Sequence, residues 1–265
     1  MVDEKFKERM ISAGYTVGKD SISMIIPWIQ KWFDENGPDC NAIVGISGGK
    51  DSAVVAALCC EALGKDRVIG IKMPNGNQKD IEDANKVINH LGIRSYEVNI
   101  GNICNTIIAE VENNLSKASE QTIINVPPRV RMTILYAFAQ SLNGRVANTC
   151  NASETFVGYE TLYGDAAGDF APIKNLSYVE VVGLGSALGL PADIVYKTPA
   201  DGLTDKTDED NLGVSYYEID AVLNGIEHHF LDHPISQETI DKIEKLRAKS
   251  IFKRDILNIP APYSL

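Results

Sequence analysis

The hydrophobic pattern of the chain alternates between short apolar runs, which are typical of buried strands, and longer segments with an apolar face at helical spacing. Strands are predicted in the run that starts at Ile43 and at residues 67–73, 95–100 and 145–149. Parallel strands need helical crossovers between them, so this alternation favours a parallel sheet with helices on both faces. We therefore expect a single α/β domain over residues 1–265, built on a doubly wound, mostly parallel sheet.

The predicted helices differ in how much of their surface is apolar. Residues 53–63 are apolar on every side, which indicates a helix buried against the sheet. In residues 21–35 the apolar side chains lie on one face, and Pro27 is expected to kink the helix. Further helices with one apolar face are predicted at residues 81–91, 103–115, 130–142, 178–188, 216–231 and 236–249.

Two stretches lack this periodicity and are expected to be mobile loops that carry function. Residues 158–170 are rich in Gly, Tyr and Asp, and residues 201–213 are polar and acidic. The acidic stretch is interpreted as a solvated loop or a lid, with a second metal site as the less favoured alternative. His228, His229 and His233 lack the HExxH spacing of a zinc site, so a cluster at a helix end is the favoured interpretation.

The chain leaves its first predicted strand through residues 45–52, which read GISGGKDS. Ser47, Gly48 and Gly49 have small side chains, so the backbone can form a nest of N–H groups at a helix N-terminus, where phosphate binds. The spacing matches neither the GxxxxGK[ST] P-loop nor a GxGxxG dinucleotide turn. Asp51 beside a phosphate implies a cation between the two, such as Mg2+. An ordinary glycine-rich turn of an α/β fold is the alternative.

The composition of the 265 residues narrows the range of partners. A net charge of −11 and a pI near 4.9 argue against a nucleic-acid or anionic-membrane surface. The five cysteines include no CxxC pair, which argues against a zinc ribbon or a disulfide framework and favours reduced thiols. The N-terminus has no apolar signal core and no run is long enough to span a bilayer, so a cytoplasmic protein without membrane contacts is expected.

The phosphate loop, together with further motifs along the chain, resembles a known protein family. SGGKDS resembles the pyrophosphate loop SGGxDS of the N-type ATP pyrophosphatases, whose fold is adenine nucleotide alpha-hydrolase-like. Other matches lie at residues 129–133 (RVRMT), 148–154 (NTCNASE), 163–169 (YGDAAGD), 206–213 (KTDEDNLG) and 252–254 (FKR). In this order the motifs resemble those of the ammonia-dependent NAD+ synthetases over nearly the whole chain.

The resemblance implies a cytoplasmic ligase of NAD biosynthesis that is a homodimer, with ATP as co-substrate and Mg2+ as cofactor. In this family the nicotinate carboxylate of deamido-NAD+ attacks the α-phosphate of ATP and pyrophosphate leaves. Ammonia then displaces AMP from the adenylated nicotinate to give NAD+. This chemistry needs no protein nucleophile, so catalysis should depend on alignment and charge neutralisation.

The resemblance also implies roles for individual residues. Asp51 and Glu154 would hold Mg2+, and Ser47, Lys50 and Asp51 are the expected catalytic residues of the loop. The implied ATP contacts are Gly45, Ile46, Ser47, Gly48, Gly49, Lys50, Asp51, Ser52, Thr149, Tyr178 and Ala200. The implied deamido-NAD+ contacts, in part from a neighbouring subunit, are Arg129, Leu162, Asp169, Phe252 and Lys253. Simpler interpretations stay open, with Glu154 as a helix cap, Arg129 as a solvated charge and Asp169 as a turn residue.

Three positions depart from the family pattern. Many members have Lys where this chain has Leu162 and Tyr178, and Thr where it has Ala200. The departures remove two cations and one hydroxyl from the implied site. We expect Lys197 or Lys206 to supply the missing positive charge to the ATP phosphates.

The nitrogen donor is expected to be free ammonia. Residue 2 is Val2 rather than the cysteine of one amidotransferase type, and the synthetase motifs occupy the whole chain, which leaves no room for an amidase domain. A separate glutaminase subunit stays open as an alternative.

Two rival interpretations belong to other classes. One is another N-type ATP pyrophosphatase with a different acceptor, against which the acidic charge and the YGDAAGD motif argue. The other is a non-catalytic regulator that binds adenine nucleotide on the same scaffold. Asp51 and Glu154 argue against the regulator, because sensing ATP does not need a cation on the leaving pyrophosphate.

Overall fold

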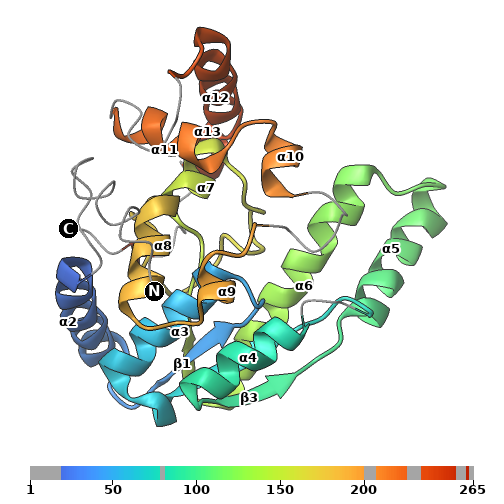
Figure 1. The fold of residues 1–265 in the computed structure, drawn as a ribbon. Helices are drawn as coiled ribbons and strands as arrows, with labels where there is room; N and C mark the ends of the chain where they lie inside the picture. Colours follow the sequence, from blue (N-terminus) through green and yellow to red (C-terminus); the bar gives the residue numbers. More distant parts are fainter. Residues whose placement is uncertain (1–18, 78–80, 200–206, 226–233, 255–260, 263–265) are drawn as a thin grey trace.

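A parallel sheet organises the fold of the computed structural model, which describes residues 19–77, 81–199, 207–225, 234–254 and 261–262. Its strands are β1 (Asn41–Gly45), β2 (Val68–Lys72), β3 (Arg94–Glu97) and β4 (Gly144–Val146), in the order β3-β2-β1-β4 with parallel neighbours. The strand order reverses beside β1, so the crossover helices lie on both faces of the sheet (Figure 1). The prediction of a doubly wound α/β fold is confirmed.

Helices connect and flank the strands. Those of the described residues are α2 (Lys19–Asn36), α3 (Lys50–Leu63), α4 (Ile81–Leu91), α5 (Gly101–Leu115), α6 (Glu120–Ser141), α7 (Ala152–Val157), α8 (Tyr178–Ala187), α9 (Ala192–Val195), α10 (Asp208–Leu212), α11 (Tyr216–Asn224), α12 (Gln237–Lys249) and α13 (Ile251–Arg254). A 3-10 helix, η1 (Lys65–Arg67), precedes β2, and the short strands β5 (Phe170–Ala171) and β6 (Ala261–Pro262) form a separate parallel pair. None of the helices in these ranges is long and apolar enough to cross a bilayer.

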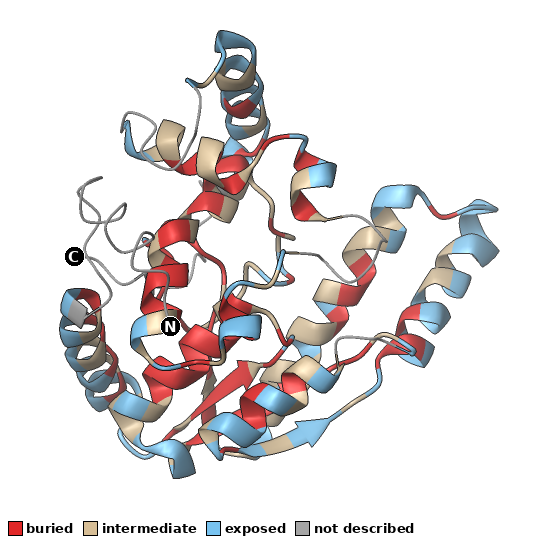
Figure 2. Ribbon diagram, in the orientation of Figure 1, coloured by how far each residue is buried: buried red, intermediate tan, exposed pale blue. Residues whose placement is uncertain are grey.

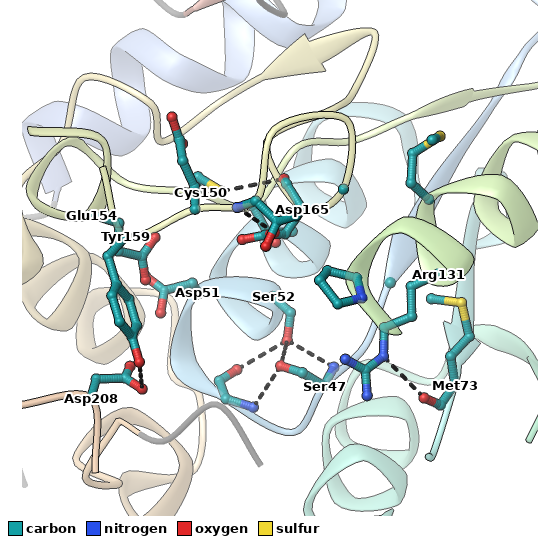
Figure 3. A pocket seen from close by; sticks show the side chains of 18 of the residues that line it. Ser47, Asp51, Ser52, Met73, Arg131, Cys150, Glu154, Tyr159, Asp165 and Asp208 are labelled. Carbon is teal, nitrogen blue, oxygen red and sulfur yellow. Dashed lines mark hydrogen bonds between the residues drawn. The ribbon is translucent and has the colours of Figure 1, made fainter. Parts of the chain in front are cut away.

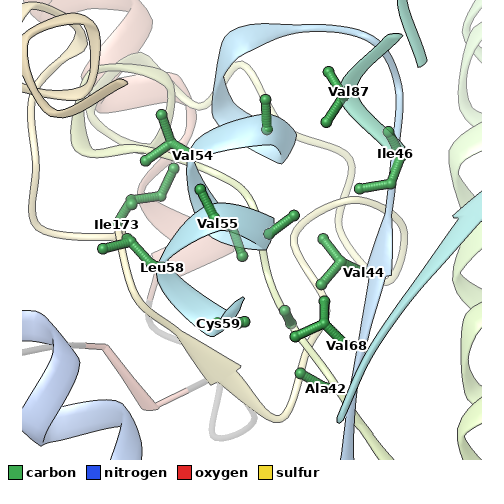
Figure 4. Packing of buried hydrophobic residues seen from close by; sticks show 14 of the residues in the cluster. Ala42, Val44, Ile46, Val54, Val55, Leu58, Cys59, Val68, Val87 and Ile173 are labelled. Atoms are coloured by element: carbon green, nitrogen blue, oxygen red, sulfur yellow. The ribbon is translucent and has the colours of Figure 1, made fainter. Parts of the chain in front are cut away.

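The side chains of β1 alternate between the two faces of the sheet and so contact two helical layers. Ala42 and Val44 lie in one core, where Val54 and Leu58 of α3 are fully buried together with residues of α2, α4 and α8 (Figure 4). Ile43 lies in the opposite core, which α5 and α6 cover. Because a strand alternates its side chains with a period of two, the central residues 42–44 of β1 must all be apolar to hold a layer on each side.

A third apolar cluster lies beyond the carboxyl edge of the sheet. Phe156 of α7 packs with Tyr216 and Ile219 of α11 and with Ile243 of α12. These helices stand above the strand ends in Figure 1 and are here called the helical cap. Figure 2 shows buried residues concentrated in β1, β2, α3 and α8, whereas the edge strand β3 and most of α5 are exposed.

Several predicted boundaries differ from the structure. The helix predicted at residues 130–142 begins at Glu120, because the Ser119 hydroxyl accepts the Thr122 N–H (3.1 Å) and caps it. The acidic loop prediction was wrong for α10, which Thr207 caps in the same way. The strands predicted at 95–100 and 145–149 are the shorter β3 and β4. Residues 200–206 and 226–233, with the three predicted cluster histidines, lie outside the described residues.

Asp220 of α11 links three helices of the molecule. Its carboxylate accepts a hydrogen bond from the Ser153 hydroxyl of α7 and one from the Val179 N–H of α8 (3.0 Å). Burial raises the pKa of Asp220 to about 7, although these hydrogen bonds act in the opposite direction. Ionising Asp220 therefore costs stability in the folded state.

This carboxyl group predicts a pH dependence of stability. Its contribution is fully present below the ordinary pKa of 3.8 and is lost as pH rises toward 7. The free energy of unfolding should fall across this window, by about 1.4 kcal/mol per unit of pKa shift. Asp220→Asn should remove the fall, as measured by thermal melting from about pH 4 to about pH 8, and the exposed Asp241→Asn should retain it. An unchanged profile in Asp220→Asn contradicts the assignment.

Candidate functional site

A cavity of about 1010 Å3 opens at the carboxyl edge of the sheet. Its walls come from the turn after β1, from α6, from the segment after β4 and from residues 158–167. Residues 197–199, α10 and Lys253 of α13 also line it, as do residues 73–74 after β2 and the start of α4. Open α/β sheets bind ligands at this edge, beside the strand where the strand order reverses.

The turn from β1 into α3 forms a compact phosphate-type loop. Gly48 has a φ of 86°, a left-handed conformation that favours glycine. The hydroxyls of Ser47 and Ser52 lie 3.1 Å apart, while the Gly49 N–H donates to Ser47 Oγ (3.2 Å) and Ser52 Oγ donates to the Gly49 carbonyl (3.1 Å; Figure 3). Gly49 is the N-cap of α3 and has no side chain to cover the first-turn N–H groups. These groups are therefore suited to bind an anion.

Lys50 is buried against aromatic rings. Its ammonium group pairs with Asp51 Oδ2 (2.8 Å), and its side chain is 3% exposed. It lies 4.3 Å from the ring centroid of Tyr178 and 5.8 Å from that of Tyr216, and these two rings stack 4.7 Å apart. Cation–π contacts of this kind stabilise a desolvated ammonium. Lys50 thus already contacts a carboxylate and two rings within its own chain.

Asp51 and Glu154 bring two carboxylates to one side of the cavity (Figure 3). Asp51 Oδ1 accepts a hydrogen bond from Asn151 Nδ2 (2.9 Å). Glu154 Oε2 accepts the Asn151 N–H (3.0 Å) in a capping box at the start of α7. Burial raises the pKa of Glu154 well above its ordinary value and the charge of Asp51 raises it further, whereas Lys50 lowers it. Glu154 therefore caps a helix and also lies within the electrostatic field of Asp51.

This pair of carboxylates fits Mg2+ bound to a phosphate. Mg2+ is usually held by one or two protein carboxylates, with phosphate oxygens and waters completing its coordination. A divalent cation would also offset the repulsion from Asp51 that raises the pKa of Glu154. Across the described residues there is no group of three His, Cys, Asp or Glu side chains placed to hold a metal without such a ligand.

Glu160, which lines the cavity, belongs to a buried ion pair that sequence reasoning missed. Glu160 accepts hydrogen bonds from Lys174 Nζ (2.7 Å) and from the Thr155 hydroxyl (3.1 Å), and both charged side chains are buried. Lys253 donates to the backbone carbonyls of Gly158 (2.7 Å) and Glu160 (2.6 Å). These contacts fix the turn that follows α7. The sequence holds no signal for them, because the paired residues lie 5 to 95 positions apart without a motif.

Cys150 places a thiol in the cavity. Its Sγ donates to the Asp165 carbonyl (3.3 Å), and burial raises the thiol pKa well above its ordinary value. A protonated buried thiol is a poor nucleophile. All five cysteines lie within the described residues as free thiols, as the composition predicted.

Many of the predicted site residues meet in this cavity. Those that line it are Gly45, Ile46, Ser47, Gly49, Lys50, Asp51, Ser52, Thr149, Glu154 and Lys253. Gly48 belongs to the same loop. Lys197, one of the two lysines expected to contact ATP, also lines the cavity. Ala200 and Lys206 lie outside the described residues.

Three further residues that the resemblance implies as deamido-NAD+ contacts, Arg129, Asp169 and Phe252, are not among the residues that line the cavity. Arg129 Nε donates to the Leu162 carbonyl (3.2 Å), so it is more than a solvated charge. Asp169 Oδ2 accepts the Val146 N–H (2.7 Å) and thereby fixes the chain after β4. The Phe252 side chain is 57% exposed. Their roles toward a ligand stay predictions.

The buried Glu160–Lys174 pair makes a prediction about stability. Lys174→Met leaves the carboxylate buried without its cation and should lower the free energy of unfolding by about 3–5 kcal/mol. The double variant Glu160→Gln/Lys174→Met removes both charges and should recover much of this loss in urea unfolding. Lys31→Met, which breaks an exposed pair with Glu35, should cost under about 1 kcal/mol. Additive losses in the double variant contradict the coupling.

Comparison with known proteins gives the family of this chain. The family model described as NAD synthase matches residues 21–257. The NH(3)-dependent NAD(+) synthetase of Pyrococcus furiosus is 39% identical over 238 residues, covering 87% of this chain and 91% of the relative. The NH(3)-dependent NAD(+) synthetase of Methanocaldococcus jannaschii is 39% identical over 233 residues, covering 86% and 90%.

Solved structures agree with the sequence relatives. The NMN synthetase from Francisella tularensis superposes with a TM-score of 0.82 at 32% identity, covering 92% of this chain and 99% of the other. The NH3-dependent NAD synthetase from Campylobacter jejuni has a TM-score of 0.74 at 27% identity, with coverage of 92% and 99%. The phosphate loop, the fold and these relatives together show that the chain belongs to the NAD synthase family.

Proposed function

We propose that the chain is a ligase that amidates deamido-NAD+ with ammonia, consuming ATP and forming NAD+, AMP and pyrophosphate. The observation that carries this proposal is the cavity in which the loop at residues 45–52 lies beside the carboxylates of Asp51 and Glu154. The relatives named NH(3)-dependent NAD(+) synthetase support the same reaction. The same relatives favour this reaction over the two rival interpretations, another N-type ATP pyrophosphatase and a non-catalytic regulator.

In this reaction the chain contributes alignment and charge. The N–H groups at the start of α3 would hold the phosphates of ATP, and the pyrophosphate would leave from this loop. The acceptor carboxylate attacks the α-phosphate, so no side chain is needed as a nucleophile. Cys150, the thiol in the cavity, is protonated and suits no such role. Ammonia then takes the place of AMP on the activated carboxyl group.

Asp51 and Glu154 are the proposed ligands of Mg2+. The ion would neutralise charge on the phosphates of ATP when it is bound. Lys50 holds one oxygen of Asp51 and the Asn151 amide holds the other, so the carboxylate is oriented before ATP arrives. Thr149 and Lys253 line the cavity and support the proposed contacts with ATP and with the acceptor.

A homodimer is the proposed assembly. Ile103, Ile107 and Leu115 of α5 and Ile123 of α6 are large apolar side chains at 40% to 69% exposure. In Figure 1 the upper ends of α5 and α6 lie away from the sheet, whereas the rest of α6 packs against β1 and β4. A second copy could cover this apolar surface, and the mass of the purified protein in solution tests the assembly. The acidic net charge supports small-molecule substrates in a cytoplasmic enzyme over a nucleic-acid partner.

A second candidate is amidation of nicotinate mononucleotide to NMN. It is favoured by the structural likeness to the NMN synthetase from Francisella tularensis, at a TM-score of 0.82. The chemistry at the carboxyl group is the same for both acceptors. The two differ in the AMP half of deamido-NAD+, which the mononucleotide lacks.

One assay separates these functions. Purified protein with ATP, Mg2+ and ammonium chloride is given deamido-NAD+ or nicotinate mononucleotide, and amide product and pyrophosphate are both measured. We expect NAD+ and pyrophosphate to form in equal amounts, and glutamine not to replace ammonium. NMN formation at a higher kcat/KM makes the second candidate the function. Absence of pyrophosphate with both acceptors contradicts the ligase assignment.

The substitution Glu154→Gln tests the proposed metal role, because it removes the negative charge of one proposed Mg2+ ligand. Gln preserves the capping box at the start of α7, so the fold should be retained. We expect kcat to fall roughly 100-fold, about 2.7 kcal/mol, and the Mg2+ concentration for half-maximal rate to rise. Glu218→Gln changes the matching capping box of α11, outside the cavity, and should leave both values unchanged. Equal effects of the two variants contradict a metal role for Glu154.

A further inference from the structure

The cavity is unfavourably charged for a triphosphate. Among the described residues that line it, six are acidic and four are basic. The acidic residues are Asp51, Glu120, Glu154, Glu160, Asp165 and Asp208, and the basic residues are Lys50, Arg131, Lys197 and Lys253. ATP bound here needs protein cations in addition to a metal, because phosphates repel nearby carboxylates.

Three of the four cations either donate to backbone carbonyls or lie buried against a carboxylate and a ring. The Lys50 ammonium is buried between Asp51 and the Tyr178 ring. Lys253 donates to two backbone carbonyls, and burial lowers its pKa. Arg131 Nε donates to the Met73 carbonyl at the end of the sheet, and Figure 3 shows its guanidinium beside Met73.

Lys197 has a different environment. It follows α9, is 29% exposed, and pairs with Asp83 Oδ2 (2.6 Å) in the first turn of α4. Both α4 and α9 contact α3, the helix that starts at the phosphate loop. A Cβ on Gly185 would meet Val195 and Val54 at 3.1 Å each, so the end of α9 lies beside the first turns of α3. Lys197 is therefore a partly exposed cation near the N-terminus of α3.

We infer that Lys197 is an ATP-binding residue that exchanges Asp83 for the triphosphate when the nucleotide binds. This rests on the proposed function, since it assumes that ATP occupies the cavity. The exchange costs little, because a partly exposed Lys–Asp pair is weak, whereas an ammonium–phosphate contact in a cavity is charge-assisted. Asp83 holds the ammonium at the cavity rim until the phosphates arrive.

Direct binding tests this inference independently of turnover. The probe is α,β-methylene ATP with Mg2+, because this nucleotide cannot be cleaved between its α- and β-phosphates. Isothermal titration calorimetry with this probe gives the Kd of each variant. We expect Lys197→Met to weaken binding tenfold or more and Lys197→Arg to stay within about threefold of the wild type. Asp83→Asn removes the competing carboxylate and should leave binding unchanged or tighten it up to about fivefold. The KM of the acceptor should not change in these variants.

A matched control distinguishes phosphate binding from a structural role of the pair. Lys86 lies on the same helix as Asp83 and forms the neighbouring ion pair with Asp193 of α9, but it does not line the cavity. Lys86→Met should bind the nucleotide like the wild type. If Asp83→Asn weakens binding as much as Lys197→Met, the pair is a structural link and the inference is overturned.

The remaining outcomes are also decisive. If Lys197→Met binds the nucleotide with the same Kd as the wild-type protein, the inference is overturned. The proposed ligase function then still stands, provided that the wild-type protein forms NAD+ and pyrophosphate. If the wild-type protein does not bind the nucleotide at all, the proposed function fails and this inference fails with it.

Discussion

The turn through residues 46–49 is the constraint on which the rest of this structure depends. It reverses the chain from β1 into α3, which requires the left-handed backbone of Gly48 and the linked hydroxyls of Ser47 and Ser52. Because β1 lies inside the sheet with a helical layer on each face, the turn cannot move without disturbing both cores. It therefore presents the α3 N-terminus to the cavity as a fixed feature.

The second constraint is electrostatic. Asp51 and Glu154 lie close enough for the charge of one to raise the pKa of the other, in a cavity that further carboxylates also line. Like charges held close together at half-buried positions destabilise a fold, so such an arrangement is typical of a site that is completed by a cationic or metal-bound ligand. Lys50 offsets part of this repulsion from within the protein.

The departure at Tyr178 acquires a physical explanation from this arrangement. The family resemblance implies a lysine at that position, but here the Tyr178 ring packs against the ammonium of Lys50. A positive charge thus lies beside position 178 although the side chain there is neutral. Its stacking partner Tyr216 comes from the helical cap, so the cap shapes the environment of the loop lysine as well as covering the strand ends.

The sequence by itself determined the parallel sheet, the buried helix after the phosphate loop, the loop itself and the family. These features depend on local periodicity and on a contiguous motif, which one sequence displays directly. Through the resemblance it also grouped Asp51 with Glu154, and both line the cavity, while their role as Mg2+ ligands stays a prediction. Helix ends such as Glu120 were set by capping contacts that periodicity does not record.

The tertiary structure alone decided which charges meet. Several of these contacts join distant segments that folding brings together at the carboxyl edge of the sheet, so no sequence motif predicts them. They are Glu160 with Lys174, Lys197 with Asp83, and Lys50 with the two stacked rings. The direction of each ammonium group follows from burial and from the nearest carboxylate or carbonyl. The sequence therefore indicates the reaction class, whereas the packing of distant segments decides which cations line the cavity.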